Sequence, residues 1–179
     1  MNASRVLLEA PGASFAQPFE MLEACHERVH RMLDLLARLR EHLRTHGADT
    51  QAQQAARDVM RYFDQAAPQH HRDEELHVFP PLLAQAAPEV QAVVRRLQQD
   101  HLAMESGWQE ARRVLAGIAD GQLPQLAPQD EAALAAFAAL HESHIRAEED
   151  IAYPHARELL DESARTAMGA EMARRRGVK

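Results

Sequence analysis

An internal repeat is the feature that most constrains what this chain can fold into. Residues 70–80 align with residues 144–154, which lie 74 positions later, and the two segments share His, Arg, Glu, Glu and Pro at matching positions. An offset of 75 residues relates His26 to His101 in the same way. Each half therefore reads as a helical hairpin that gives one histidine from its first helix and a His-x-x-x-Glu pair from its second.

Apolar residues recur at helical spacing through four long stretches of the chain. These stretches cover residues 18–46, from 50 to about 83, from 88 to about 121, and from 128 to about 160. We expect Pro68 to kink or split the second stretch, because a proline inside a helix removes a hydrogen bond and clashes with the preceding turn. Short connections between long helices predict an all-α, up-down-up-down four-helix bundle with a short C-terminal helix.

The predicted bundle divides the chain into three parts. Residues 1–17 form an N-terminal extension, residues 18–160 form the bundle, and residues 161–179 form a short, solvated C-terminal helix and tail. A chain of 179 residues can bury the core of one ordinary domain without disulfide bonds.

Charge and composition exclude several classes of protein. The 20 Lys and Arg residues against 27 Asp and Glu residues give a net charge of −7, so the chain has no basic excess for nucleic acid. No apolar run reaches the roughly 20 residues of a membrane span, and the N-terminal apolar stretch is too short for a signal peptide. The single Cys25 cannot form an internal disulfide and is best explained as a small core residue. We expect a cytoplasmic protein.

The repeated His-x-x-x-Glu pairs point to metal binding. Residues i and i+4 share one face of a helix, so each pair can aim an imidazole and a carboxylate at one point. Such donors in a bundle interior are costly without a cation, and the pattern contains no cationic partner. Solvated helix faces and core histidines are the simpler structural explanations, but the apolar stripe and the repeat oppose them. The predicted ligands are His26, His70, Glu74, His101, His144 and Glu148.

The mixed donor set favours particular metals. Imidazole and carboxylate together suit iron or manganese, and the absence of cysteine argues against structural zinc. Two carboxylates from opposite sides suit a bridge between two ions. A ferritin-like site would use Glu-x-x-His motifs, and Glu23-x-x-His26 has that spacing, but Gln98 precedes His101 at the same spacing in the second half. The repeat therefore favours the His-x-x-x-Glu assignment.

The remaining histidines have weaker claims to the site. His30 and Glu105 follow His26 and His101 by one helical turn and are candidates for further ligands or for hydrogen-bond partners of the ligands. We expect three histidines on the surface, namely His42, His46 and His71. Three others lie near the apolar stripes and could line the cavity without binding metal: His77, His141 and His155.

The ordered motifs resemble the hemerythrin-like, HHE cation-binding family. The resemblance covers roughly residues 22–154 and rests on the two segments that run from His-x-x-x-Glu-Glu to Phe79-Pro80 and to Tyr153-Pro154, each with a histidine on the preceding helix. It implies a four-helix bundle around a carboxylate-bridged, non-haem di-iron centre that meets oxygen, nitric oxide or peroxide. The same six residues would be the ligands, with manganese or zinc as substitutes for the two iron ions.

One position departs from the respiratory members of that family. Glu105 stands where those proteins have a second histidine, four residues after the ligand on the third helix. We therefore expect a protein that binds or senses O2, NO or reactive oxygen species, or that takes part in iron and redox protection, rather than a reversible oxygen carrier. The alternatives are an iron-dependent regulatory or interaction protein and a di-iron enzyme that reduces NO or peroxide. No catalytic residue is assigned, and the protein partner stays open.

Overall fold

The computed structural model describes residues 14–178, so residues 1–13 of the predicted N-terminal extension lie outside the described part. Within residues 14–178 the chain is helical and contains no strand. The helices are α2 (Pro18–His46), α3 (Thr50–Asp73), α4 (Phe79–Gln85), α5 (Pro88–Ala119), α6 (Pro128–Ala139), α7 (His141–Ala147), α8 (Tyr153–Leu159) and α9 (Glu162–Arg175). Two π-helical segments interrupt them, η1 (Glu74–Val78) and η2 (Glu148–Ala152).

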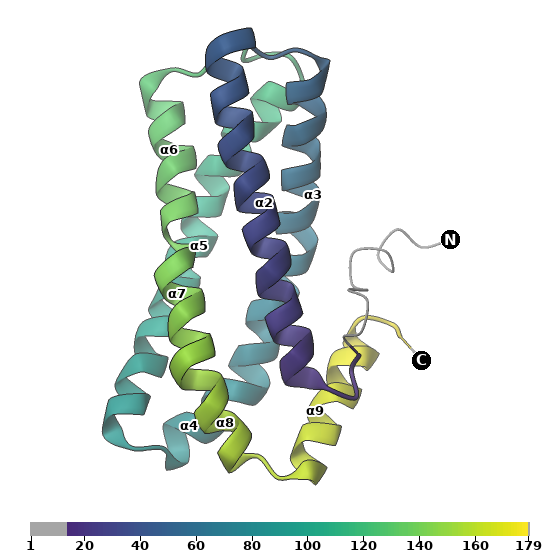
Figure 1. The fold of residues 1–179 in the computed structure, drawn as a ribbon, viewed down its shortest axis with the longest axis vertical. Helices are drawn as coiled ribbons and strands as arrows, with labels where there is room; N and C mark the ends of the chain where they lie inside the picture. The colour runs from purple at the N-terminus through teal and green to yellow at the C-terminus, as the bar shows by residue number, and fades with distance from the viewer. Residues whose placement is uncertain (1–13, 179) are drawn as a thin grey trace.

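Four antiparallel arms form the bundle (Figure 1). The first arm is α2, the second is α3 with η1 and α4, the third is α5, and the fourth runs from α6 through α7 and η2 to α8. Consecutive arms run in opposite directions, which confirms the predicted all-α bundle. None of the helices in residues 14–178 is long and apolar enough to cross a membrane.

Local sequence signals set the helix ends. Helix α2 ends at Gly47, whose φ of 74° lies in the left-handed region that glycine adopts without strain. Asp49 caps α3, because its carboxylate accepts a hydrogen bond from the backbone N–H of Ala52 at 2.9 Å. Pro88 and Pro128 occupy the first positions of α5 and α6, where the missing N–H of proline costs nothing.

The sequence predicts a kink or a split at Pro68, and the split is not found. Helix α3 runs undivided through Pro68, and the irregular turns lie further along, at η1 and η2. Each π-helical segment directly precedes an aromatic residue and then a proline, Pro80 or Pro154. A proline ring clashes with the carbonyl four residues earlier in an α-helix, and the wider π turn makes room for it. The internal repeat is thus visible as two matching π-helical segments.

Buried apolar side chains form two clusters, one toward each end of the bundle. The first includes Leu36, Phe63, Leu115 and Phe137, and the second includes Phe19, Phe79, Leu97 and Tyr153. On each arm, buried polar residues lie where one cluster gives way to the other. We call this set the polar layer, and its members are His26, His70, Glu74, His101, His144 and Glu148. The six predicted ligands therefore cross the middle of the bundle.

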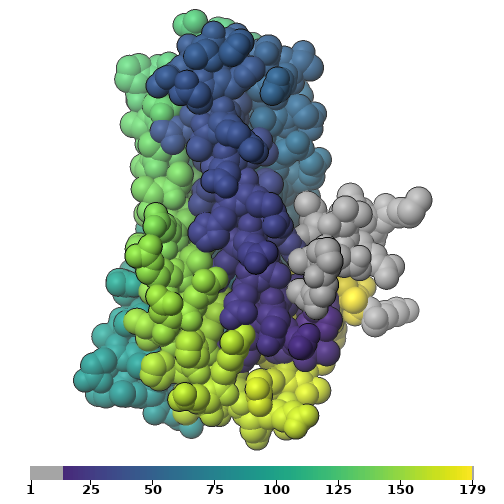
Figure 2. Space-filling view, in the orientation of Figure 1, coloured from purple at the N-terminus to yellow at the C-terminus, as the bar shows by residue number. Residues whose placement is uncertain are grey.

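The sequence predicts a solvated C-terminal helix, but the structure shows this helix packed against the bundle. Met168 and Met172, one turn apart on α9, are 2% and 0% exposed and join the second apolar cluster. Arg175 and Arg176 both bind the buried carboxylate of Asp73, the last residue of α3. Helix α9 (yellow) lies against the start of α2 (purple) in Figure 2. Two apolar residues in a polar sequence were too weak a signal for this contact.

Candidate metal centre

All six residues of the polar layer are buried and converge in two groups. The first group contains His26, His70, Glu74 and Glu148, whose ligand atoms lie within 4.8 Å of one another. The second group contains only imidazoles, with His101 and His144 in it. Two groups of this kind, side by side, are what a centre with two ions requires.

Each carboxylate of the polar layer reaches both groups. Glu148 Oε2 lies 3.1 Å from His26 Nε2, while its Oε1 lies 2.8 Å from His144 Nε2. Glu74 behaves alike, because Oε1 lies 3.4 Å from His70 Nε2 and Oε2 lies 3.4 Å from His101 Nε2. One oxygen of each carboxylate therefore faces each group, which is the arrangement of a bridging ligand.

Many of these atoms have no hydrogen bond although they lie close together. Among the described residues, the buried atoms without a hydrogen-bond partner include His70 Nδ1, Glu74 Oε2, His101 Nε2, His144 Nε2 and both carboxylate oxygens of Glu148. His26 Nε2 and His70 Nε2 do form a hydrogen bond, at 3.0 Å, but the short distances from the oxygens of Glu148 to the imidazoles lack the angles of hydrogen bonds. Orphaned buried polar atoms cost about 1–3 kcal/mol each unless something binds them. A metal cation fits this donor set.

Outer carboxylates orient three of the imidazoles. His26 Nδ1 donates to Glu149 at 2.8 Å, and His101 Nδ1 donates to Glu75 at 3.0 Å. These two pairs are related by the repeat, and each joins a histidine of one half to a carboxylate of the other. His144 Nδ1 lies 3.4 Å from Asp100. Such partners fix ring orientation and leave Nε2 facing the centre.

Aromatic rings from the repeat cover the imidazoles. Tyr153 stacks on His26 with ring centroids 5.5 Å apart, and Phe79 stacks on His101 at the same separation. The Tyr153 hydroxyl donates to Glu74 Oε1 at 2.5 Å. The π-helical turn brings each aromatic ring back to the ligand face, because five residues complete one turn from Glu74 to Phe79 and from Glu148 to Tyr153. The aromatic–proline pairs are visible in the sequence, but the sequence alone predicts no role for them.

Mutual contacts set the charges of the polar layer. Burial alone would raise the pKa of Glu148, but the imidazoles against its oxygens hold that pKa well below its ordinary value. Burial would lower the pKa of His26, yet the Glu148 carboxylate close to its ring raises it to about 9. Contact with Glu148 and Glu74 likewise raises the pKa of His101 to about 10 against the effect of burial. Burial and the charge of Glu148 raise the pKa of Glu74 to about 7. Without metal, protons neutralise the centre.

Comparison with known proteins agrees with this geometry. The family model of the hemerythrin HHE cation-binding domain matches residues 17–156. The chain belongs to the hemerythrin HHE cation-binding family. It is also 32% identical over 167 residues to an uncharacterized protein of Haemophilus influenzae, a match that spans 93% of this chain and 94% of that protein. Membership of the HHE family implies a metal-binding site, and the polar layer is the place in the bundle where His and Glu clusters gather.

The two candidates for further ligands, His30 and Glu105, do not join the polar layer. His30 is exposed and lines a surface hollow beside Glu149. Glu105 is also exposed and lies in the wall of a pocket of about 740 Å3. A side chain one helical turn after a ligand lies near the ligand's face of the helix. Both of these side chains are nevertheless exposed to solvent.

The other histidines mostly find partners away from the centre. His77 Nε2 lies 2.7 Å from Glu171, while His141 and His155 each contact the carbonyl four residues earlier, Phe137 and Ile151. His42 contacts Asp49 and His46 is exposed, as predicted for surface residues. Burial raises the pKa of the Cys25 thiol to about 11, in keeping with a core residue.

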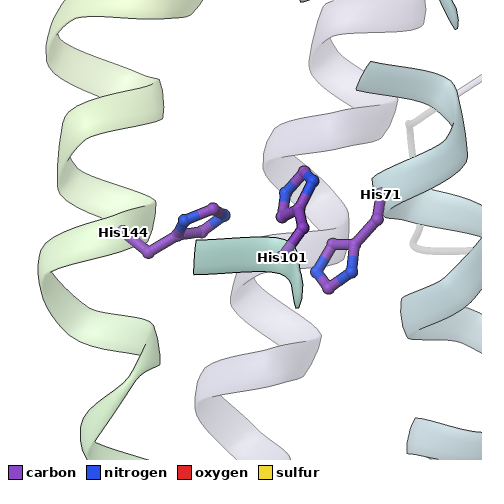
Figure 3. Close-up of side chains that lie close together, drawn as sticks. All are labelled: His71, His101 and His144. Carbon is purple, nitrogen blue, oxygen red and sulfur yellow. The ribbon is translucent and has the colours of Figure 1, made fainter. Parts of the chain in front are cut away.

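His71 differs from its prediction. The sequence predicts a surface position for His71, but its ring stacks on the ring of His101, with centroids 4.0 Å apart and planes 16° apart. Its ligand nitrogen belongs to the second group with His101 and His144 (Figure 3). The internal repeat does not identify His71 as a site residue, because the equivalent position in the second half is Ile145. The adjacent pair His70-His71 was the signal available in the sequence.

Proposed function

We propose that this HHE domain is a cytoplasmic protein that binds two iron ions, which Glu74 and Glu148 would bridge. It binds or senses O2, NO or reactive oxygen species, or takes part in iron and redox protection. One observation carries the proposal: each carboxylate directs one oxygen to each imidazole group. Imidazole and carboxylate donors suit iron, and manganese or zinc are the expected substitutes.

The chain's own residues prepare the centre for a small ligand. A bound iron pair supplies electrons and a coordination position for a diatomic molecule or peroxide. Glu75 and Glu149 hold His101 and His26 with their Nε2 atoms toward the centre. The Tyr153 hydroxyl keeps a proton against Glu74, since burial raises the pKa of this phenol well above its ordinary value. The two apolar clusters exclude water above and below the polar layer.

A pocket gives a small molecule a route to this centre. Its volume is about 740 Å3, and it reaches His101 between α3 and α5. Trp108, Phe63 and Met104 line it, so its wall is largely apolar and suits uncharged gases.

Metal analysis of one matched pair of variants tests the proposal. Protein produced with iron should contain about two metal ions per chain. Glu148→Ala should lose most of that metal, whereas Glu142→Ala should keep it, because Glu142 is an exposed carboxylate that contacts Arg146. Addition of NO or O2 to protein that has been reduced anaerobically should change its optical spectrum. One zinc ion per chain, or equal iron content in the two variants, would contradict the proposal.

A di-iron enzyme that reduces NO or peroxide is the second candidate. The contact between the Tyr153 hydroxyl and Glu74 favours it, because reduction consumes protons and the raised pKa of Glu74, about 7, lets this carboxyl hold a proton near neutral pH. Repeated consumption of NO or peroxide with a chemical reductant would identify an enzyme. Binding without turnover would identify a sensor or binding protein.

A further inference from the structure

We infer that His71 is a seventh metal ligand, which joins His101 and His144 in a three-imidazole position facing the pocket. The inference rests on the proposed function, because it needs a metal centre in the polar layer. It makes the two metal positions unequal in their number of imidazole ligands.

The geometry of the three rings supports this position. His71, His101 and His144 each offer a ring nitrogen within 4.8 Å of the others. They come from three different helices, α3, α5 and α7, and point toward one another in Figure 3. Three imidazoles from separate helices can surround one ion, as neighbours on a single helix cannot.

The nitrogens of His71 are available for a ligand bond. Its contacts among the described residues are ring contacts with His70, His101 and His144, and neither of its nitrogens has a hydrogen bond there. His141 on the same pocket wall differs, because its Nδ1 is committed to the carbonyl of Phe137. The His71 ring can therefore turn about its own side-chain torsion toward His144 without breaking a hydrogen bond.

The repeat shows that only one metal position gains this donor. Ile145, the counterpart of His71, is 4% exposed and packs in the first apolar cluster. The position near His26 and His70 therefore has two imidazoles, and the position near His101 and His144 has three. The fifth imidazole of the centre comes from α3, whereas Glu105 on α5 points to solvent.

Access also differs between the two positions. His71 and His101 both line the pocket of about 740 Å3, so a molecule in the pocket meets the three-imidazole position. On the other side, Tyr153 is 0% exposed and its ring is stacked on His26. The pocket thus gives solvent and free imidazole access to the His71 position.

Three variants separate coordination from packing. His71→Phe keeps a flat ring against His101 but removes the donor nitrogens. His71→Gly removes the ring and leaves a gap that opens to the pocket, where free imidazole can enter. His141→Phe is the matched control, since it removes a histidine from the same pocket wall whose nitrogen is already bonded.

Cobalt(II) titration and X-ray absorption spectroscopy measure the outcome. We expect His71→Phe to weaken binding of one of two Co2+ ions by about tenfold or more and to lower the imidazole count in the absorption spectrum. Millimolar imidazole should restore the parent spectrum in His71→Gly and not in His71→Phe, while His141→Phe should match the parent. Circular dichroism of the metal-free variants confirms that each is folded.

The outcomes distinguish the two proposals. Two ions in the parent with equal affinity and spectra in His71→Phe would overturn the role of His71 and leave the di-metal proposal intact. A single ion in the parent would overturn the di-metal proposal. In that case loss of the ion in His71→Phe would still support the His71 ligand, and its retention would reject it.

Discussion

Tyr153 and Phe79 occupy equivalent positions in the two halves, and each stacks on the histidine of the opposite half. They differ by one hydroxyl, which in Tyr153 donates to Glu74. The repeat therefore builds two similar walls around the centre, and this hydroxyl breaks their symmetry at one metal position.

Tyr153→Phe tests that hydroxyl directly. The substitution leaves Glu74 Oε1 without its donor, so the metal-free protein should lose about 1–3 kcal/mol of unfolding free energy in urea. Metal affinity should fall about tenfold, because the hydroxyl orients a ligand. Tyr62→Phe is the control, since Tyr62 donates to the carbonyl of Cys25 and should change stability alone. Unchanged metal affinity in Tyr153→Phe would assign its hydroxyl a purely structural role.

Metal uptake should release protons at neutral pH. The pKa values of His26 and His101 are raised to about 9 and 10 in the metal-free protein, so both rings carry a proton at pH 7 that metal must displace. About two protons per centre should appear in calorimetric titrations that compare buffers of different ionisation enthalpy. Metal affinity should rise from pH 7 toward pH 9. Heats independent of the buffer would show that the two rings are neutral before metal binds.

His141 should make the metal-free fold sensitive to acid. Burial lowers the pKa of His141 to about 4, below its ordinary value of 6.5, so the unfolded chain binds the proton first. The stability from this group is present above pH 6.5 and is lost as the pH falls toward 4. Between pH 7 and pH 4.5, His141→Phe should lose less unfolding free energy than the parent, by on the order of 2 kcal/mol.

His155→Phe is the control for this prediction. His155 Nδ1 also contacts the carbonyl four residues earlier, but the side chain is exposed. In denaturant titrations, the unfolding free energy of His155→Phe should vary with pH as that of the parent does. Parallel curves of unfolding free energy against pH for His141→Phe and the parent would refute the prediction.

The C-terminal helix should stabilise the segment that carries Glu74. Asp73 is 0% exposed, and both Nη atoms of Arg176 bind its carboxylate. Arg176→Ala should cost about 3 kcal/mol or less of unfolding free energy, because Arg175 still contacts Asp73. Since Asp73 directly precedes Glu74, metal retention during dialysis should also fall. Arg174→Ala removes an exposed neighbour and should have neither effect.

The sequence predicts the arms of the bundle better than their irregular turns. Helix α2 covers residues 18–46 as expected, because its apolar stripe, Pro18 and Gly47 all agree. The local effect of Pro68 predicts a kink or a split in the helix. Helix α3 is nevertheless not split, and buried residues lie on both sides of Pro68, namely Val59 and Phe63 before it and His70 after it. A π-helical turn depends on what its side chains contact across the bundle, which helical periodicity does not describe.

The candidate centre was predictable where the repeat applies. The six residues that recur in both halves do converge, whereas His71 and the Tyr153 hydroxyl have no counterpart in the other half. Asp100 lies outside the motifs altogether and reaches His144 only because α5 packs beside α7. Contacts between arms therefore limit what a motif can predict.

The division of the core into two apolar clusters leaves a polar boundary at which the metal-free bundle can open locally. Without metal, the bundle carries a layer of orphaned polar atoms at half its height, and each end must stay folded across it. Local opening at this layer gives metal a way in and gives proteases their substrate. Metal bound at this layer should slow such opening, so limited proteolysis should cleave the metal-free protein faster than the metal-loaded protein.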